Sequence, residues 1–169
     1  MIIFGIDPGS VRTGWGVVRS EGSRIAFVDA GVVRAPAESE LSHRMERIFV
    51  ELNAKLREYG PDHVFLESVF HHKSAKSALI LGHARGVALL AARLSAARID
   101  ELSPAEIKKA VTGHGRAEKP QVQEMVRIIL GLAERAQADA ADALAVAIAG
   151  VQRARSPLAA MLDRRRGTR

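Results

Sequence analysis

Apolar residues at the start of the chain occur in runs that are typical of β-strands. Residues 1–6 form an uninterrupted apolar run, which predicts a strand buried on both faces of a sheet. Turn-forming residues 8–10 and 21–23 separate this run from residues 13–19 and 25–33, which we interpret as two further strands. Three strands joined by short turns predict an antiparallel meander.

The apolar spacing changes at residue 41. From there to residue 56, apolar side chains recur at steps of three and four, which predicts an amphipathic helix that Gly60 and Pro61 end. A short apolar run before Glu67 predicts a fourth strand. The later pattern predicts a helix over 74–95, a strand over 99–102, and helices over 103–112, 120–130 and 138–151. Strands first, then strands alternating with helices, predict an α/β fold in which helices flank a mixed five-stranded sheet.

Composition narrows the class of protein. The chain has 169 residues, of which 47% are hydrophobic, and this favours one domain with a buried core. The absence of cysteine excludes disulfides, a thiolate nucleophile and any cysteine-ligated metal site. No basic leader precedes Asp7, so we expect no signal peptide and a cytoplasmic location. The longest apolar region, residues 78–97, is interrupted by His83, Arg85 and Arg93, which predicts that the chain does not enter a membrane.

Positive charge is concentrated at the C-terminal end. The formal net charge is +6, and residues 152–169 contribute most of it through their arginines, whereas residues 1–151 are almost neutral. We therefore expect a folded domain over 1–151 and a basic, disordered tail over 152–169. That tail is either a solvated end or an arm that binds nucleic acid.

Four carboxylates stand where a structural role explains them poorly. Asp7 and Glu67 each follow a strand that should be buried, and a carboxylate there costs desolvation energy unless it is hydrogen-bonded or binds a cation. Asp139 and Asp142 share one face at the start of an otherwise apolar helix. Singly, Asp7 and Glu67 could cap loops, and Asp139 could complement the helix dipole. Taken together, these acids favour a ligand site, because the ends of buried strands often converge on one.

Oxygen donors without cysteine and without a clear histidine ligand favour Mg²⁺ or Mn²⁺ over zinc. Two such ions about 4 Å apart activate a water and stabilise the leaving oxygen in phosphodiester cleavage. Complementary positive charge lies between the second and third acidic elements, at Lys73, Lys76, Arg85, Lys108, Lys109, Arg116 and Lys119. Phe70, in the polar loop after Glu67, is either partly buried or a group that stacks on unpaired bases.

Five blocks of sequence together resemble a known family, the RuvC family of Holliday junction resolvases. The blocks are Gly-Ile-Asp-Pro-Gly-Ser at 5–10 with Thr-Gly-Trp-Gly at 13–16, Glu-Ser-Val-Phe at 67–70, residues 78–86, residues 111–119, and Ala-Asp-Ala-Ala-Asp-Ala at 138–143. They occur in the family's order and span residues 1–151. The first block alone is weakly specific, because actin-like ATPases and sugar kinases share a similar loop.

The resemblance implies a ribonuclease H-like fold, a homodimer, and Mg²⁺-dependent cutting of opposed strands in a four-way DNA junction, with a branch-migration motor of the RuvA and RuvB type as partner. It implies two Mg²⁺ ions per active site, which Mn²⁺ would replace. The implied catalytic metal ligands are Asp7, Glu67, Asp139 and Asp142. Lys108 and Lys119 match basic positions of the family near the scissile phosphate, and Lys119 is the implied catalytic cation. Phe70 matches the aromatic that enters the junction. The expected DNA contacts are Phe70, Lys73, Lys76, Lys108, Lys109, Arg116 and Lys119.

Two other classes of protein fit the residues less well. A two-lobed phosphotransferase needs a second nucleotide-binding lobe, for which 169 residues leave no room. A junction-binding module without catalysis would use the basic residues but gives no reason for grouped acids, which repel DNA unless metals neutralise them. The small residues Ala78, Gly82 and Gly86 form a ridge on one helix face, and either a second subunit or the sheet would pack against it.

Overall fold

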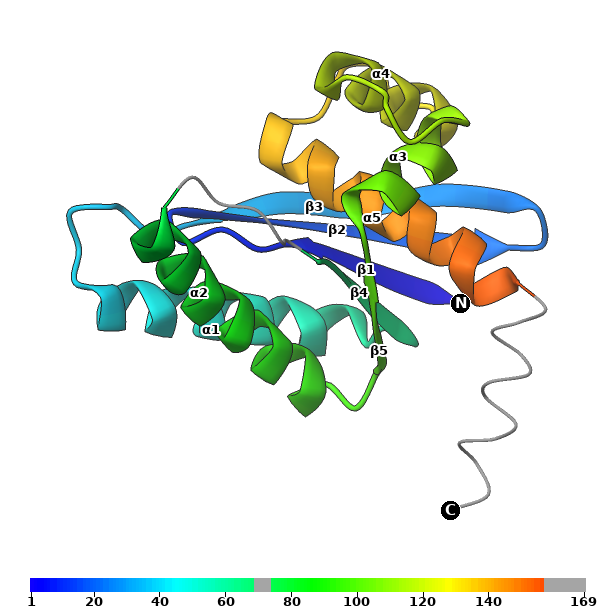
Figure 1. Ribbon diagram of the computed structural model, residues 1–169. Coiled ribbons are helices and arrows are strands. Elements are labelled where there is room, and N and C mark those ends of the chain that lie inside the picture. Colours follow the sequence, from blue (N-terminus) through cyan, green and yellow to red (C-terminus); the bar gives the residue numbers. More distant parts are fainter. Residues whose placement is uncertain (69–73, 157–169) are drawn as a thin grey trace.

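The core of the protein is one five-stranded mixed sheet. The computed structural model describes residues 1–68 and 74–156, and its strands lie in the order β3-β2-β1-β4-β5 (Figure 1). The strands are β1 (Ile2–Asp7), β2 (Arg12–Glu21), β3 (Arg24–Arg34), β4 (His63–Glu67) and β5 (Arg98–Leu102). The first three strands pair antiparallel, and β1, β4 and β5 pair parallel. The predicted meander and mixed sheet are therefore confirmed.

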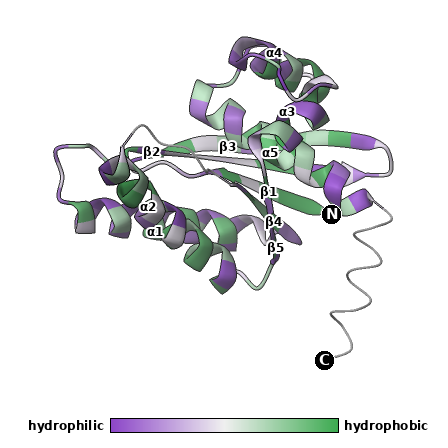
Figure 2. Ribbon diagram, viewed as in Figure 1, coloured by the Kyte–Doolittle hydropathy of each residue, from purple (hydrophilic) through white to green (hydrophobic). Residues whose placement is uncertain are grey.

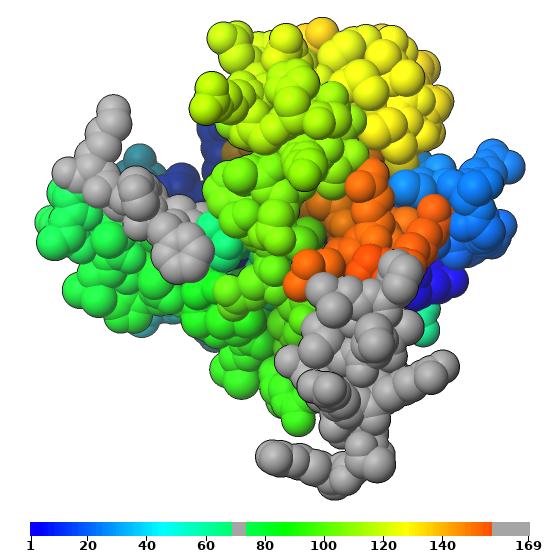
Figure 3. All heavy atoms as spheres, turned by 45° about the vertical axis from the view of Figure 1, so that its right-hand side comes forward, coloured from blue at the N-terminus to red at the C-terminus, as the bar shows by residue number. Residues whose placement is uncertain are grey.

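Helices cover both faces of the sheet. Helices α1 (Leu41–Tyr59) and α2 (Ala75–Leu94) lie on one face, and α3 (Pro104–Thr112), α4 (Lys119–Leu130) and α5 (Ala138–Arg155) lie on the other (Figure 1). Each face has its own apolar core, and the alternation of green and purple along α1 in Figure 2 is that of an amphipathic helix. Figure 3 shows α3, α4 and α5 packed against one another. The three-layer arrangement matches the prediction from the sequence.

Helix α5 packs directly on the central strands because glycines there leave room for its backbone. A Cβ atom on Gly5 of β1 would come within 2.2 Å of the Ala143 carbonyl oxygen, and one on Gly14 of β2 would come within 2.0 Å of the Asp139 carbonyl oxygen. Any larger residue at either position would push the helix away. This close approach brings the start of α5, with both of its aspartates, to the end of β1.

Helix α5 also continues beyond its expected end at residue 151. It runs to Arg155, whose guanidinium donates hydrogen bonds to Ser20 Oγ and to the carbonyl oxygens of Ser23 and Arg24. These bonds join the end of the helix to the β2–β3 turn. The first residues of the expected tail are thus helical, and residues 157–169 lie outside the described part of the chain.

Helix α2 has an exposed apolar face. Ala84, Ala88 and Ala91 are buried, whereas Leu79 and Leu90 on the other side are 65% and 52% exposed. A Cβ atom on Gly82 or Gly86 would meet no atom within 4 Å among the described residues. The small-residue ridge therefore faces outward, and the alternative that it packs on the sheet is wrong. By length and hydropathy alone α2 is long and apolar enough to cross a membrane.

Candidate active site

The parallel pairing of β1 and β4 places two carboxylates side by side. Ile6 pairs with Leu66, so the next residues, Asp7 and Glu67, end neighbouring strands at the same edge of the sheet. A cleft of about 950 Å³ opens at this edge. Among the residues that line it are Asp7, Glu67, Asp142, Lys108, Lys119, Arg12 and Arg44. The cleft thus collects carboxylates from the sheet and from α5 together with cations from both sides.

The carboxylates repel one another strongly. Burial, followed by the charges of Glu67 and Asp142, raises the pKa of Asp7 from its ordinary 3.8 to about 8, although Lys119 opposes the shift. Burial and the charge of Asp142 likewise raise the pKa of Glu67, while a hydrogen bond with Asp7 lowers it. Two carboxyls with raised pKa values in one cleft are typical of a catalytic or cation-binding site.

Lys119 supplies the nearest positive charge. Its Nζ forms an ion pair with Asp142 Oδ2, and this contact raises the pKa of Lys119. Lys119 begins α4, directly after the loop in which Gly113 takes a φ of 86° that favours glycine. The lysine side chain is 59% exposed, so its ammonium is also available to a ligand in the cleft.

Asp139 lies at the margin of the cleft. It is not among the residues that line the cavity, and it pairs with Arg12 at 3.7 Å between Nη1 and Oδ2. Oδ2 of Asp139 is buried and accepts no hydrogen bond from the described residues. The charge of Asp139 nevertheless contributes to the raised pKa of Asp7. The structure therefore brings all four predicted carboxylates together, three inside the cleft and one beside it.

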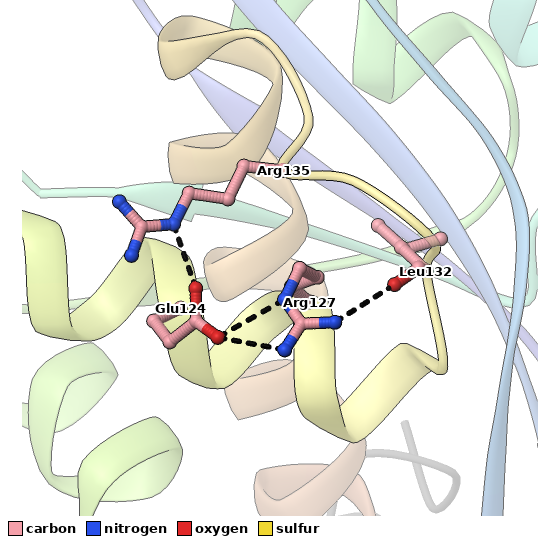
Figure 4. Close-up of polar contacts among 4 residues, drawn as sticks. All are labelled: Glu124, Arg127, Leu132 and Arg135. Carbon is pink, nitrogen blue, oxygen red and sulfur yellow. Dashed lines mark hydrogen bonds and ion pairs between the residues drawn. The ribbon is translucent and has the colours of Figure 1, made fainter.

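A polar network holds the segment that leads to Asp139. Glu124 of α4 accepts hydrogen bonds from Arg127 and Arg135, and Arg127 also donates to the Leu132 carbonyl oxygen (Figure 4). The two guanidinium groups lower the pKa of Glu124 to about 2. The network ties the α4–α5 connection to α4 and so helps to fix where α5 begins.

The donor set of the cleft fits a hard divalent cation. All four acids offer oxygen ligands, and the buried Oδ2 of Asp139 lacks a hydrogen-bond donor. Within residues 1–68 and 74–156, no three acidic or histidine side chains already surround a single point. Ligation by Asp142 would require its carboxylate to leave Lys119. The chemistry of the residues thus suits Mg²⁺. In this structure Lys119 pairs with one of the ligands, Asp142.

The expected DNA contacts divide into three groups. Lys108 and Lys119 line the cleft, whereas Lys76, Lys109 and Arg116 are described and do not line it. Phe70 and Lys73 lie outside the described residues. Arg85 pairs with Glu101 of β5. Sequence reasoning missed Arg12 and Arg44. Arg12 begins β2 and has no distinguishing pattern, whereas Arg44 lies four residues before Ile48 on the buried stripe of α1, a spacing that could have marked it.

Comparison with known proteins identifies relatives over nearly the whole described chain. A family model for the crossover junction endodeoxyribonuclease RuvC matches residues 3–150. The RuvC of Heliobacterium modesticaldum is 45% identical over 149 residues, which cover 88% of this chain and 92% of the relative. That of Citrifermentans bemidjiense is 47% identical over 148 residues, which cover 88% of this chain and 90% of the relative.

Solved structures agree in fold. Thermus thermophilus RuvC in complex with Holliday junction substrate superposes with a TM-score of 0.87 at 34% identity, covering 92% of this chain and 95% of that one. The yeast mitochondrial Holliday junction resolvase has a TM-score of 0.62 at 14% identity, covering 89% of this chain and 78% of that one, and shows likeness of fold alone. The expected ribonuclease H-like fold is confirmed.

Proposed function

The chain belongs to the RuvC family of crossover junction endodeoxyribonucleases, and we propose that it cuts Holliday junctions with two Mg²⁺ ions held by the four carboxylates of the cleft. The activity, hydrolysis of phosphodiester bonds in a four-way DNA junction, follows from family membership. The observation that carries the metal proposal is the convergence of Asp7, Glu67 and Asp142 on one cleft, where burial and then mutual repulsion raise the pKa values of Asp7 and Glu67. A divalent cation relieves that repulsion.

The proposed ligands are Asp7, Glu67, Asp139 and Asp142. When bound, Mg²⁺ would supply activation of water and stabilisation of the leaving oxygen, and Mn²⁺ would substitute for it. Asp7 and Glu67 sit on neighbouring strand ends, and Asp142 sits on a helix packed against them, so the backbone already holds these three ligands near one another. Asp139 would turn its buried Oδ2, which accepts no hydrogen bond from the described residues, from Arg12 towards the site.

The cations of the cleft wall act on the DNA. We place Lys119 and Lys108 beside the scissile phosphate, because both line the cleft and the charges of both act on Glu67. Lys119 would exchange its ion pair with Asp142 for a contact with the phosphate as the carboxylate takes up metal. Lys73, Lys76, Lys109, Arg116 and Phe70 are proposed as contacts with the arms and crossover of the junction. The basic end of the chain, residues 152–169, is proposed as a further DNA contact.

A cleavage assay on a synthetic four-way junction tests this function. With Mg²⁺ we expect nicks in two opposed strands, and with a chelator in place of Mg²⁺ we expect no nicks. A linear duplex of the same sequence is the control and should remain intact under both conditions. Cleavage that persists in chelator would contradict the metal proposal, and equal cleavage of the duplex would contradict selectivity for junctions.

A second subunit would cover the exposed face of α2. Leu79, Leu90 and Leu94 are more than half exposed around the outward ridge of Gly82 and Gly86, and such an apolar surface is typical of an interface. A two-fold dimer would set one carboxylate cluster against each of two opposed strands of a junction. We therefore propose a homodimer that is formed through α2, acts in the cytoplasm, and is supplied with junctions by a RuvA and RuvB type motor.

We expect Leu90→Glu to convert the dimer into a monomer, because a buried unpaired carboxylate at the interface is costly. On a supercoiled plasmid with an extruded cruciform, the wild-type protein should give mainly linear product. The monomer should give nicked circle, since one nick relaxes the plasmid and the cruciform is reabsorbed. Sedimentation and gel analysis measure the two effects.

Ile128→Glu is the matched control for that variant. Ile128 is 55% exposed on α4, on the other face of the sheet, so the same substitution there should leave the protein dimeric and the product linear. A Leu90→Glu protein that remains dimeric would contradict the proposed interface. It would leave the nuclease assignment standing.

A further inference from the structure

Arg44 is a buried cation to which the proposed function assigns no role. It lies in the first turn of α1, its side chain lines the cleft, and the residue is only 9% exposed. Among the described residues no other lysine or arginine is buried. A buried guanidinium is costly unless a partner compensates its charge, so its position calls for a specific role.

Arg44 is held by hydrogen bonds to a carbonyl oxygen, but no negatively charged group among the described residues pairs with it. Nε and Nη2 donate hydrogen bonds of 2.8 and 2.5 Å to the carbonyl oxygen of Ser10. No carboxylate of the described residues forms an ion pair with the guanidinium, and none of them accepts a hydrogen bond from Nη1. The carbonyl fixes the orientation of the planar group while leaving its charge for an anion that enters the cleft.

The loop that holds Arg44 is itself rigid. Thr13, which is fully buried, donates from Oγ1 to the Gly9 carbonyl oxygen at 2.7 Å and accepts from the Gly9 amide at 3.3 Å. The turn is so tight that a Cβ atom on Gly9 would lie 2.0 Å from the Arg12 carbonyl oxygen. Since this loop directly follows Asp7, the guanidinium is held in a fixed relation to the carboxylates.

Arg44 and the two lysines of the cleft lie on opposite sides of the carboxylates. Lys108 and Lys119 reach the cleft from α3 and α4 on one face of the sheet, and Arg44 reaches it from α1 on the opposite face (Figure 1). A DNA strand laid across the carboxylates passes between these two groups. We propose that Arg44 binds one backbone phosphate of the cleaved strand, on the side of the scissile phosphate away from Lys108 and Lys119.

This proposal rests on the proposed function, because it assigns the substrate strand to the same cleft. Its test is a binding measurement on a four-way junction in chelator, which reports affinity and not cutting, so its outcome is distinguishable from that of the metal proposal. Loss of one phosphate contact lowers the log–log salt slope by about 0.9 on duplex DNA. For Arg44→Gln we expect that decrease and an affinity that is about tenfold weaker.

Arg47→Gln is the matched control. Arg47 lies three residues further along α1, is 54% exposed in its side chain and pairs with Glu51, so the same change in charge should leave the salt slope and affinity as in the wild type. An Arg44→Gln protein with a wild-type salt slope overturns the proposal, whether or not its melting temperature falls, because a residue that only braces the loop does not release counterions.

A chemical double-mutant cycle identifies the phosphate. Single phosphates of the cleaved strand are replaced by neutral methylphosphonates, and affinity is measured for the wild type and for Arg44→Gln. We expect one position whose neutralisation weakens binding by the wild type and leaves binding by the variant unchanged. Additive effects at every position overturn the proposal. If Arg44→Gln does not fold, the same cycle with Arg44→Lys, which keeps the charge but loses the fork, gives the same contrast at reduced size.

Discussion

Asp7→Asn should abolish cleavage of a four-way junction, to below about one-thousandth of the wild-type rate, and leave junction binding intact or tighter. The substitution keeps the size of the side chain and removes one metal ligand. It also removes a negative charge that repels the DNA backbone and the neighbouring carboxylates. Single-turnover cleavage in Mg²⁺ and binding in chelator measure the two effects, and cutting at the wild-type rate would exclude Asp7 as a ligand.

The same variant should be more stable than the wild type in the absence of metal. The pKa of Asp7 is raised to about 8 in the folded protein, so between about pH 4 and pH 8 the folded state binds more protons than the unfolded state. The free energy of unfolding of the metal-free wild type therefore falls as the pH rises through this window. Asparagine carries no such proton, and Asp7→Asn should melt at a higher temperature at pH 8. Glu38→Gln, a change at an exposed loop residue, should show no such gain.

Lys119→Met should lower the cleavage rate about 100-fold at saturating Mg²⁺, the cost of removing one charge-stabilising donor at a reacting centre. Binding of the junction should weaken much less, because a single phosphate contact is lost among many. The charge of Lys119 opposes the raised pKa of Asp7, so its removal should also shift the rise of activity with pH to higher pH.

Two further variants separate the role of Lys119 from a general loss of charge. Lys119→Arg keeps the charge and should recover part of the rate. Lys55→Met removes a lysine of α1 that pairs with Glu58 and does not line the cleft, and it should cut at the wild-type rate. If Lys119→Met cuts at an unchanged rate, Lys119 has no part in the reaction and only forms the ion pair with Asp142.

The order and type of the elements were predictable because the pattern and the packing agree. The apolar run at residues 1–6 is a central strand that is buried on both faces, and the helical spacing from residue 41 is the buried stripe of α1. The end of α5 was not predictable in this way. Its continuation to Arg155 is stabilised by hydrogen bonds to the β2–β3 turn, which lies more than 130 positions earlier in the chain.

The candidate site was predictable only in part. The ends of β1 and β4 and the face of α5 were enough to group Asp7, Glu67 and Asp142. That Asp139 would lie beside the cleft with Arg12 depends on the exact rotation of α5 on the sheet, which the glycines of β1 and β2 determine. Arg44 lies four residues before Ile48, on the buried stripe that Leu52 and Leu56 continue, so its spacing marks it as buried. The spacing does not reveal the carbonyl group of another loop that accepts its hydrogen bonds.

The direction of the small-residue ridge needed the structure as well. Gly82 and Gly86 at a spacing of four permit close approach of any neighbour, and the sequence does not say on which side of α2 the sheet lies. The alanines Ala84, Ala88 and Ala91 contact the core instead. The ridge therefore faces outward, as the proposed dimer interface requires.

The central claim is that the four carboxylates form one divalent-metal centre, and counting bound Mn²⁺ tests it most directly. Electron paramagnetic resonance of free Mn²⁺ in a titration above pH 8, where Asp7 is ionised, gives the number of ions held per subunit. We expect about two for the wild type, and weaker or lost binding for Asp7→Asn, Glu67→Gln and Asp142→Asn, with circular dichroism as the check that each variant is folded. A count of zero for the wild type, or the same count and affinity in all three variants, would contradict the account.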